Sequence, residues 1–330
     1  MLRLGIIGFG LHAEKRLVPA LQRCRSVRLV ALSRRDAALA QGSAAKHGVA
    51  HAFSSAEELC RCQEVDAVFV ATPNVLHCPD TLTAIAHRKP VLCEKPMAMN
   101  AAECESMVKA AREAGVALGV AQVFRFARSV QRTREWVAAG EVGRPVLARA
   151  EFTYPGIGHA RTWIHNRAIG GGATADVGVH CIDALRFILH DEVAEVDGRA
   201  AFDLYSQQTD ASAALVLRFA QGTLGTVGVS MRTGYRTAVE VIGENGVVRA
   251  ENGLALDLPV RIELLRQGSL VRAEDVSNGD AFVRQFDAFA AAVEGRGEFP
   301  CPGEEGWRNQ MVLDAAYAKL GEVAKFDLVK

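Results

Sequence analysis

The sequence predicts an α/β protein of two domains: an N-terminal doubly wound parallel sheet, then an α+β domain with a large, open, mostly antiparallel sheet. The chain has 330 residues, 49% of them hydrophobic and 23% charged, which is enough for two ordinary cores. We expect the domains at residues 1–121 and 122–330, joined by a direct strand crossover. In an alternative arrangement, the C-terminal helix packs back on the first domain.

Five apolar, β-branched runs mark the strands of the first sheet, and helical stretches separate them. Short apolar strands in alternation with helices predict right-handed βαβ units and therefore a parallel sheet. The expected strands are Leu2 to Gly8, Val27 to Ser33, Ala67 to Ala71, Pro90 to Glu94 and Gly115 to Gln122.

The pattern changes after about Pro145, where a helix over Ala173 to Leu189 precedes closely spaced strand candidates. Asn245-Gly246 predicts a tight type I′ turn, because both residues tolerate a positive φ. A later helix, Asp280 to Val293, repeats phenylalanines on one face, and we expect these to lie in a core. The expected strands are Ala211 to Phe219, Thr223 to Ser230, Thr237 to Gly243 and Gly246 to Ala250.

Composition argues against several classes of partner. The 38 basic and 38 acidic residues cancel, so no overall charge recruits nucleic acid or an anionic membrane. The N-terminus lacks the features of a signal peptide, and no run approaches 18 apolar residues. The eight cysteines form neither a C-x-x-C pair nor a paired metal spacing. We therefore expect a cytoplasmic protein with reduced thiols, no metal site, no nucleic-acid partner and no membrane partner.

A glycine-rich turn follows the first expected strand and opens a helix. Gly8 permits the tight turn, Gly10 lets the backbone approach a pyrophosphate, and Ala13 replaces a third glycine where helix and strand pack closely. The helix amides, including those of Leu11 and His12, then face the phosphates. This context predicts a Rossmann dinucleotide-binding domain; the alternative is a glycine turn in another α/β fold.

The end of the second strand favours NADP over NAD. An NAD site normally places a carboxylate here to accept from the ribose 2′-hydroxyl, whereas this sequence has Ser33, Arg34 and Arg35. A hydroxyl and a cationic fork suit a 2′-phosphate. In the alternative, the two arginines are solvated and Asp36 binds the ribose, so that NAD is also accepted.

Two further stretches place ionisable side chains where chemistry is expected. Lys95 follows Glu94 at the carboxyl end of a parallel strand, which is the ligand side of such a sheet, and Pro96 restricts its backbone. After three glycines, Asp176, His180 and Asp183 fall on one helical face, and an imidazole beside a carboxylate suits proton transfer. The alternatives are a surface lysine, a zinc site and a core histidine.

Together these motifs resemble the glucose-fructose oxidoreductase/inositol dehydrogenase (Gfo/Idh/MocA) family. The resemblance rests on the stretch Gly8 to Ala13, on Ala71-Thr72-Pro73-Asn74 with His77, on Glu94-Lys95-Pro96, and on Gly170-Gly171-Gly172 leading to Asp176-x-Gly178-x-His180. The motifs occur in the expected order up to about residue 185, and the rest of the chain matches only in architecture.

The resemblance assigns roles to individual residues. Lys95 would orient the reacting oxygen, His180 would exchange the hydroxyl proton, and Asp176 would help fix the substrate and the histidine. Lys95 and His180 would converge on one nicotinamide face. Further cofactor contacts would come from Thr72, Pro73, Asn74, His77 and Glu94. Our other substrate-side candidates are Gln122, Arg125, Tyr154, Trp163 and His165.

The resemblance also implies an activity on CH–OH groups. The expected enzyme is an NADP(H)-dependent oxidoreductase that interconverts a secondary hydroxyl and a ketone on a sugar, polyol or related cyclic substrate, closer to the sugar-reductase branch than to inositol dehydrogenases. The alternatives are a dihydrodiol- or tetrapyrrole-type enzyme and a non-catalytic dinucleotide sensor. The open C-terminal sheet implies a homodimer or homotetramer, as in relatives.

Overall fold

The computed structural model describes residues 1–156, 162–202 and 209–320. Contacts between residues group the chain into two compact units. Unit 1 comprises Met1–Ala127 and Gly279–Gln310, and unit 2 comprises Arg128–Asn278 and the segment from Met311. Each unit contains one sheet, one parallel and one mostly antiparallel, and this confirms the predicted fold class.

The sheet of unit 1 is parallel throughout, in the order β3-β2-β1-β4-β5-β6. The five expected strands are present, although four of them are shorter than their apolar runs. The sequence did not reveal β3, because its three residues are only half-buried and form no apolar run. The strands are β1 (Leu2–Ile7), β2 (Val27–Ser33), β3 (His51–Phe53), β4 (Ala67–Val70), β5 (Val91–Cys93) and β6 (Leu118–Val120).

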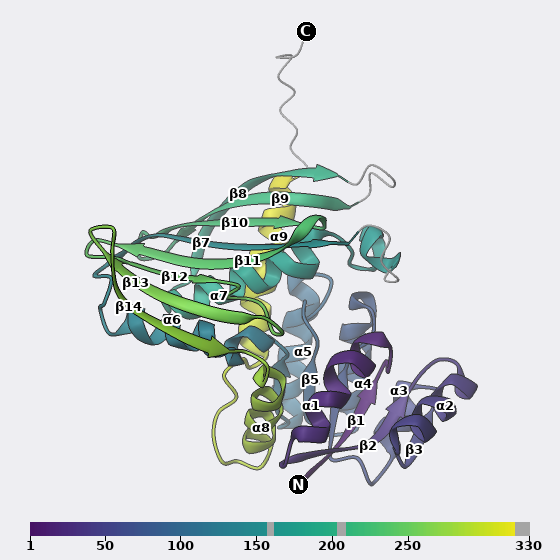
Figure 1. The fold of residues 1–330 in the computed structure, drawn as a ribbon. Coiled ribbons are helices and arrows are strands. Elements are labelled where there is room, and N and C mark those ends of the chain that lie inside the picture. The colour runs from purple at the N-terminus through teal and green to yellow at the C-terminus, as the bar shows by residue number, and fades with distance from the viewer. Residues whose placement is uncertain (157–161, 203–208, 321–330) are drawn as a thin grey trace. The chain divides into compact units, whose positions relative to one another are not determined.

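The helices of unit 1 include one from the far end of the sequence. Figure 1 shows α8 (Ala281–Val293) beside α1, and the two helices are in contact. Phe286 and Phe289 of α8 are buried, and Phe286 packs against Phe69 of β4 with ring centroids 5.8 Å apart, so the predicted core face is confirmed. The other helices are η1 (Ala13–Leu17), α1 (Val18–Arg23), α2 (Ala37–His47), α3 (Ala56–Arg61), η2 (Asn74–Leu76), α4 (His77–Ala86), α5 (Ala101–Ala114) and η3 (Val123–Phe126).

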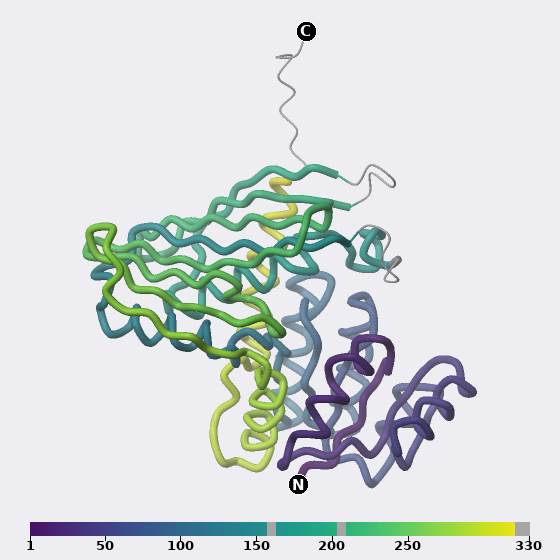
Figure 2. The backbone as a smooth tube through the Cα atoms, in the orientation of Figure 1, coloured from purple at the N-terminus to yellow at the C-terminus, as the bar shows by residue number. Residues whose placement is uncertain are grey.

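The sheet of unit 2 has eight strands in the order β14-β13-β12-β11-β7-β10-β9-β8, and Figure 2 follows its backbone. The pair β7 and β10 is parallel, and the other neighbouring strands are antiparallel. The strands are β7 (Pro145–Pro155), β8 (Val193–Phe202), β9 (Asp210–Phe219), β10 (Leu224–Ser230), β11 (Arg232–Gly243), β12 (Val247–Glu251), β13 (Pro259–Arg266) and β14 (Ser269–Ser277).

Helices cover one face of this second sheet. Helix α7 (Val179–Leu189) packs on β7, and α6 (Arg128–Ala138) packs on β12, β13 and β14. Alternate residues of β9 are buried or exposed, as expected for a strand with one covered face. The remaining helices are η4 (Thr162–His165), η5 (Arg167–Ile169), η6 (Thr174–Gly178) and α9 (Gly303–Leu320), which begins in unit 1 and continues in unit 2.

The turn predicted at Asn245-Gly246 is wrong in type. The loop joins β11 to β12, but neither residue has a positive φ. The N–H groups of Glu244 and Asn245 donate to the carbonyls of Arg144 and Val142, at 3.1 and 2.8 Å, so contacts with an earlier segment set the shape of the loop. Two consecutive positive φ angles occur instead at Gln267 (49°) and Gly268 (77°), between β13 and β14.

Candidate active site

The glycine turn after β1 contains two glycines with different requirements. Gly8 has a φ of 80°, and a Cβ placed on it would lie 2.5 Å from Thr72 Cγ2, so the fold itself requires glycine there. A Cβ on Gly10 would meet only Gly8 O, at 3.8 Å, so the fold leaves open space at this position. That space, beside the first amides of the following helix, fits the close approach of a pyrophosphate.

His12 and Glu94 form an ion pair at the carboxyl edge of the parallel sheet. His12 Nε2 lies 2.9 Å from Glu94 Oε1, and the Lys95 N–H donates to Oε2 at 3.1 Å. Burial opposes ionisation of Glu94, but the charge and hydrogen bond of His12, together with the electrostatic contributions of nearby Lys95 and His77, hold the pKa of the carboxyl below its ordinary value. The sequence predicted both residues as cofactor contacts but not that they contact each other.

The residues after β2 differ in what they contact. The guanidinium of Arg34 donates to Ser43 Oγ of α2 at 2.8 Å, whereas Arg35 is exposed. Asp36 caps α2, because its carboxylate accepts from the Leu39 N–H at 3.0 Å. Ser33 is buried at the end of the strand. In the NAD alternative, the Asp36 carboxylate would bind the ribose. In this structure it already accepts a hydrogen bond from its own helix.

His77 links the loop after β4 to the loop after β5. Its Nδ1 lies 2.7 Å from the Pro96 carbonyl oxygen, and its Nε2 lies 2.8 Å from that of Thr72. Burial lowers the pKa of His77, and the neutral ring can donate its single N–H to one of these two carbonyls. Thr72 in turn donates its hydroxyl to Asp80 at 2.8 Å. This network holds the Pro96 backbone directly after half-buried Lys95.

Asp176 and His180 are buried in unit 2, and both contact β7. The Tyr154 hydroxyl donates to Asp176 Oδ2 at 2.5 Å, and the Phe152 ring stacks on His180 with centroids 6.3 Å apart. Alternate residues of a strand point to the same face, so Phe152 and Tyr154 support neighbouring positions of one helix. Tyr154 was expected to bind substrate, and here it holds the carboxylate. Sequence reasoning missed Phe152, although its spacing from Tyr154 was a usable signal.

The other substrate-side candidates lie in both units. In unit 1, Gln122 and Arg125 are buried, and the Arg125 guanidinium donates to Glu305 Oε2 at 2.7 Å and to the Pro300 carbonyl at 2.8 Å. In unit 2, Trp163 and His165 are half-buried on η4. Asn74 is buried at the start of η2, and Pro73 is exposed just before it.

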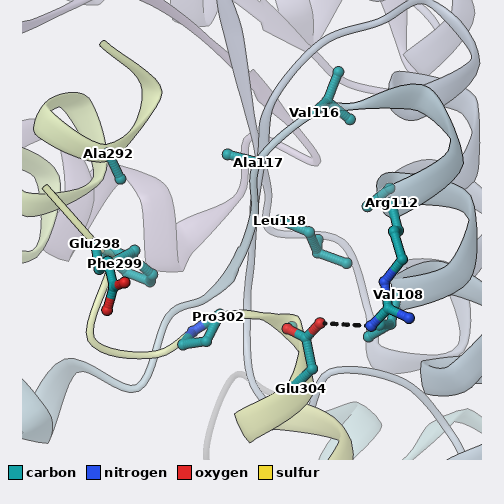
Figure 3. Close-up of a pocket in the computed structure, with 12 residues that line it drawn as sticks. Val108, Arg112, Val116, Ala117, Leu118, Ala292, Glu298, Phe299, Pro302 and Glu304 are labelled. Carbon is teal, nitrogen blue, oxygen red and sulfur yellow. Dashed lines mark hydrogen bonds and ion pairs between the residues drawn. The ribbon is translucent and has the colours of Figure 1, made fainter. Parts of the chain in front are cut away.

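A pocket of about 510 Å³ lies elsewhere in unit 1 (Figure 3). It adjoins the beginning of β6 at Leu118, at the amino edge of the sheet, and Arg112 and Glu304 form an ion pair of 3.4 Å across it. Gly8 and Glu94 follow the carboxyl ends of β1 and β5, at the other edge of the sheet. The pocket is therefore separate from the glycine turn.

The described residues hold neither a candidate metal site nor a membrane-spanning helix. They contain no group of three or more His, Cys, Asp or Glu placed to hold a metal ion. Among the same residues, no helix combines the length and the apolar character needed to span a bilayer. The eight cysteines lie within the described ranges, and none of them forms a disulfide.

Comparisons with known proteins identify the family of this chain. The profile of the oxidoreductase family with an NAD-binding Rossmann fold matches residues 2–122, and that of the GFO/IDH/MocA C-terminal domain matches residues 130–249. A 1,5-anhydro-D-fructose reductase of Ensifer adhaerens is 32% identical, over 93% of this chain and 92% of that protein. A trans-1,2-dihydrobenzene-1,2-diol dehydrogenase of Mus musculus is 32% identical, over 76% and 74%.

Solved structures share the fold over nearly the whole chain. An aldose-aldose oxidoreductase from Caulobacter crescentus superposes with a TM-score of 0.89 at 24% identity, covering 96% of this chain and 97% of that one. A 3-ketoreductase from Actinomadura kijaniata, solved with NADP and TDP-benzene, gives 0.86 at 24% identity, covering 97% and 98%. The chain therefore belongs to the Gfo/Idh/MocA family of oxidoreductases, with an NAD-binding Rossmann domain at its N-terminus.

Proposed function

We propose that this protein is an NADP(H)-dependent oxidoreductase that interconverts a secondary hydroxyl and a ketone on a sugar, polyol or related cyclic substrate. The observation that carries the proposal is the buried Asp176 and His180, held by Tyr154 and Phe152 of β7. An imidazole beside a carboxylate supplies the acid/base chemistry that carbinol oxidation requires. The open space at Gly10 supplies the place for a dinucleotide.

Each proposed catalytic residue has a separate task. When bound, the nicotinamide cofactor exchanges hydride with the carbinol carbon. His180 takes the hydroxyl proton during oxidation and returns it during reduction. Lys95 donates a hydrogen bond to the reacting oxygen, and its positive charge stabilises the alkoxide that develops there. Asp176 stabilises the imidazolium that His180 becomes. A dinucleotide sensor would need neither Lys95 nor His180.

We assign the preference for NADP to the residues after β2. Exposed Arg35 is the first candidate to bind a 2′-phosphate, with Ser33 and Arg34 beside it, and Asp36 is engaged as a helix cap. Among solved neighbours, the 3-ketoreductase contains NADP and an oxidoreductase from Agrobacterium radiobacter contains NAD+.

Dissociation constants test the assignment. We expect tighter binding of NADPH than of NADH. Arg35→Ala should weaken NADPH binding about 10- to 100-fold, the effect of losing one charge-assisted hydrogen bond. Equal affinities would contradict it.

The substrate class follows from two similar relatives. The reductase of Ensifer adhaerens is named for 1,5-anhydro-D-fructose, and this favours reduction of a cyclic keto-sugar. The mammalian relative favours a second candidate, oxidation of a trans-dihydrodiol. A panel of keto-sugars with NADPH, run beside inositols and dihydrodiols with NADP, distinguishes the two by the rate of change in absorbance at the nicotinamide band. Absence of turnover across the panel would contradict the proposed function.

The open face of the second sheet is our proposed homodimer interface. Cross-strand registers align an apolar row across six strands, including Leu224 opposite Leu147 and Val247 opposite Leu265. Leu147 and Leu224 are each 45% exposed, which is unusual for neighbouring leucines on a sheet face that remains in contact with solvent. Sedimentation velocity tests the assignment: Leu147→Asp should convert a dimer or tetramer into smaller species. The full row is Leu224, Leu147, Ile242, Val247, Leu265 and Leu270.

A further inference from the structure

The helix that carries Asp176 and His180 is capped by residues distant in sequence. Its cap position, Ala173, offers no side-chain hydrogen bond. Instead, the Thr174 N–H and hydroxyl both donate to Asp210 Oδ2, each at 2.6 Å. The Ala175 N–H donates to the Tyr317 hydroxyl at 3.0 Å. The first amides of this helix, which usually lack partners in a helix, are therefore satisfied by β9 and α9.

Asp210 is buried, and its carboxylate is enclosed by neighbouring residues. It is the first residue of β9 and is only 2% exposed. Its second oxygen lies 3.3 Å from the Tyr317 hydroxyl, and the Arg167 guanidinium lies 3.5 Å from the centroid of the Tyr317 ring. A Cβ on Gly172, whose φ is 120°, would lie 2.1 Å from Asp210 Oδ1. The third glycine of the triple-glycine stretch thus leaves room for this carboxylate.

The capped segment is a wide turn next to the proposed acid/base pair. Residues Thr174–Gly178 form a π-helical turn, a geometry that is rare and commonly found at functional sites. Asp176 lies two residues after Thr174, and His180 lies one turn further on. A buried carboxylate that accepts from an amide makes a strong, directional bond, favoured by the positive end of the helix dipole. The orientation of this turn therefore depends on Asp210.

We propose that Asp210, assisted by Tyr317, is a positioning residue that sets the placement of Asp176 and His180 for proton transfer. The inference rests on the proposed function, because it requires that these two residues take part in the reaction. Asp210 acts through Thr174 and the π-helical turn.

Matched variants in the full-length protein test the proposal. Asp210→Asn keeps the shape of the side chain but removes its charge, so the Thr174 N–H and hydroxyl lose their charge-assisted bonds to it. Thr174→Val removes the hydroxyl at nearly constant volume, whereas Thr174→Ser keeps it. We expect Asp210→Asn and Thr174→Val to lower kcat about tenfold or more with KM changed much less, and to shift the pH profile of kcat, while Thr174→Ser stays within about threefold of wild type. Asp197→Asn, an exposed carboxylate on β8, is the control.

Two measurements separate positioning from a purely structural role. NADPH affinity, read by fluorescence, should stay within about twofold of wild type in every variant. If Asp210→Asn lowers only Tm and leaves kcat and its pH profile unchanged, the proposal is overturned. If Asp210→Asn fails to fold, the same comparison of Tm, kcat and pH profile is made with Thr174→Val.

A double variant separates failure of this inference from failure of the proposed function. If Asp210 acts through the acid/base pair, Asp210→Asn should add little to the loss caused by His180→Ala. Additive losses would overturn the positioning role. A His180→Ala enzyme that retains nearly full activity would instead remove the proposed function.

Discussion

The two units position their functional side chains in different ways. In unit 1, the candidate residues follow strand ends, and His12, after β1, contacts Glu94, after β5. In unit 2, Asp176 and its helix are held by Tyr154, Asp210 and Tyr317, which come from β7, β9 and α9. A parallel sheet brings its ligand residues together by topology alone, whereas the helix of unit 2 needs partners from distant strands.

Within unit 1, the largest effect is expected at Lys95. Lys95→Ala should lower kcat about 100- to 1000-fold, because the ammonium stabilises charge that develops only in the transition state. NADPH affinity should change far less. Steady-state kinetics of ketone reduction checks this, with Lys46→Ala, an exposed lysine of α2 paired with Glu14, as the control. A Lys95→Ala enzyme within a few-fold of wild type would remove Lys95 from the reaction.

The same difference decides what could be read from the sequence. Val27–Ser33 matches its expected strand, and the requirement for glycine at position 8 follows from local chain geometry. Phe152, Asp210 and Tyr317 could not be assigned, because their roles depend on contacts between residues far apart in sequence. The type I′ turn predicted at Asn245-Gly246 was wrong for the same reason. Hydrogen bonds with an earlier segment, not local propensity, determine the backbone conformation of this loop.

Within unit 1, the two glycines of the turn should respond oppositely to alanine. Gly8→Ala forces a positive φ on a side chain that also meets Thr72, so the free energy of unfolding should fall by about 1–3 kcal/mol. Gly10→Ala meets only Gly8 O at 3.8 Å, so stability should hold while the Kd for NADPH rises about tenfold or more. Urea unfolding and fluorescence titration measure the two effects. If Gly10→Ala binds NADPH normally, the assigned pyrophosphate position is wrong.

Tyr154 tests how unit 2 holds its carboxylate. Tyr154→Phe removes one charge-assisted hydrogen bond to Asp176, worth about 1.5–3 kcal/mol, and should lower kcat by about tenfold. The matched control is Tyr235→Phe, an exposed tyrosine of β11 whose ring remains against Phe152. Equal kinetics for the two variants would show that Asp176 does not need Tyr154.

The smallest expected effect concerns the His12–Glu94 pair. Glu94 has a lowered pKa in the fold, so its ionisation stabilises the protein above its unfolded pKa of about 4.3, and that stability is lost as pH falls through the folded value. His12→Ala removes the largest of the interactions that offset burial, so the folded pKa of Glu94 rises and acid unfolding should begin at a higher pH. Circular dichroism against pH checks this. In a Glu94→Gln background the His12→Ala shift should disappear, and its persistence would point to another group.

The most direct test of the central claim is a single-turnover experiment with His180→Ala. We predict that the variant binds NADPH with wild-type affinity, because unit 1 is unchanged, but oxidises it in the presence of a ketone substrate about 100- to 10,000-fold more slowly. A rate within a few-fold of wild type at equal NADPH occupancy would contradict the division of labour between the two units.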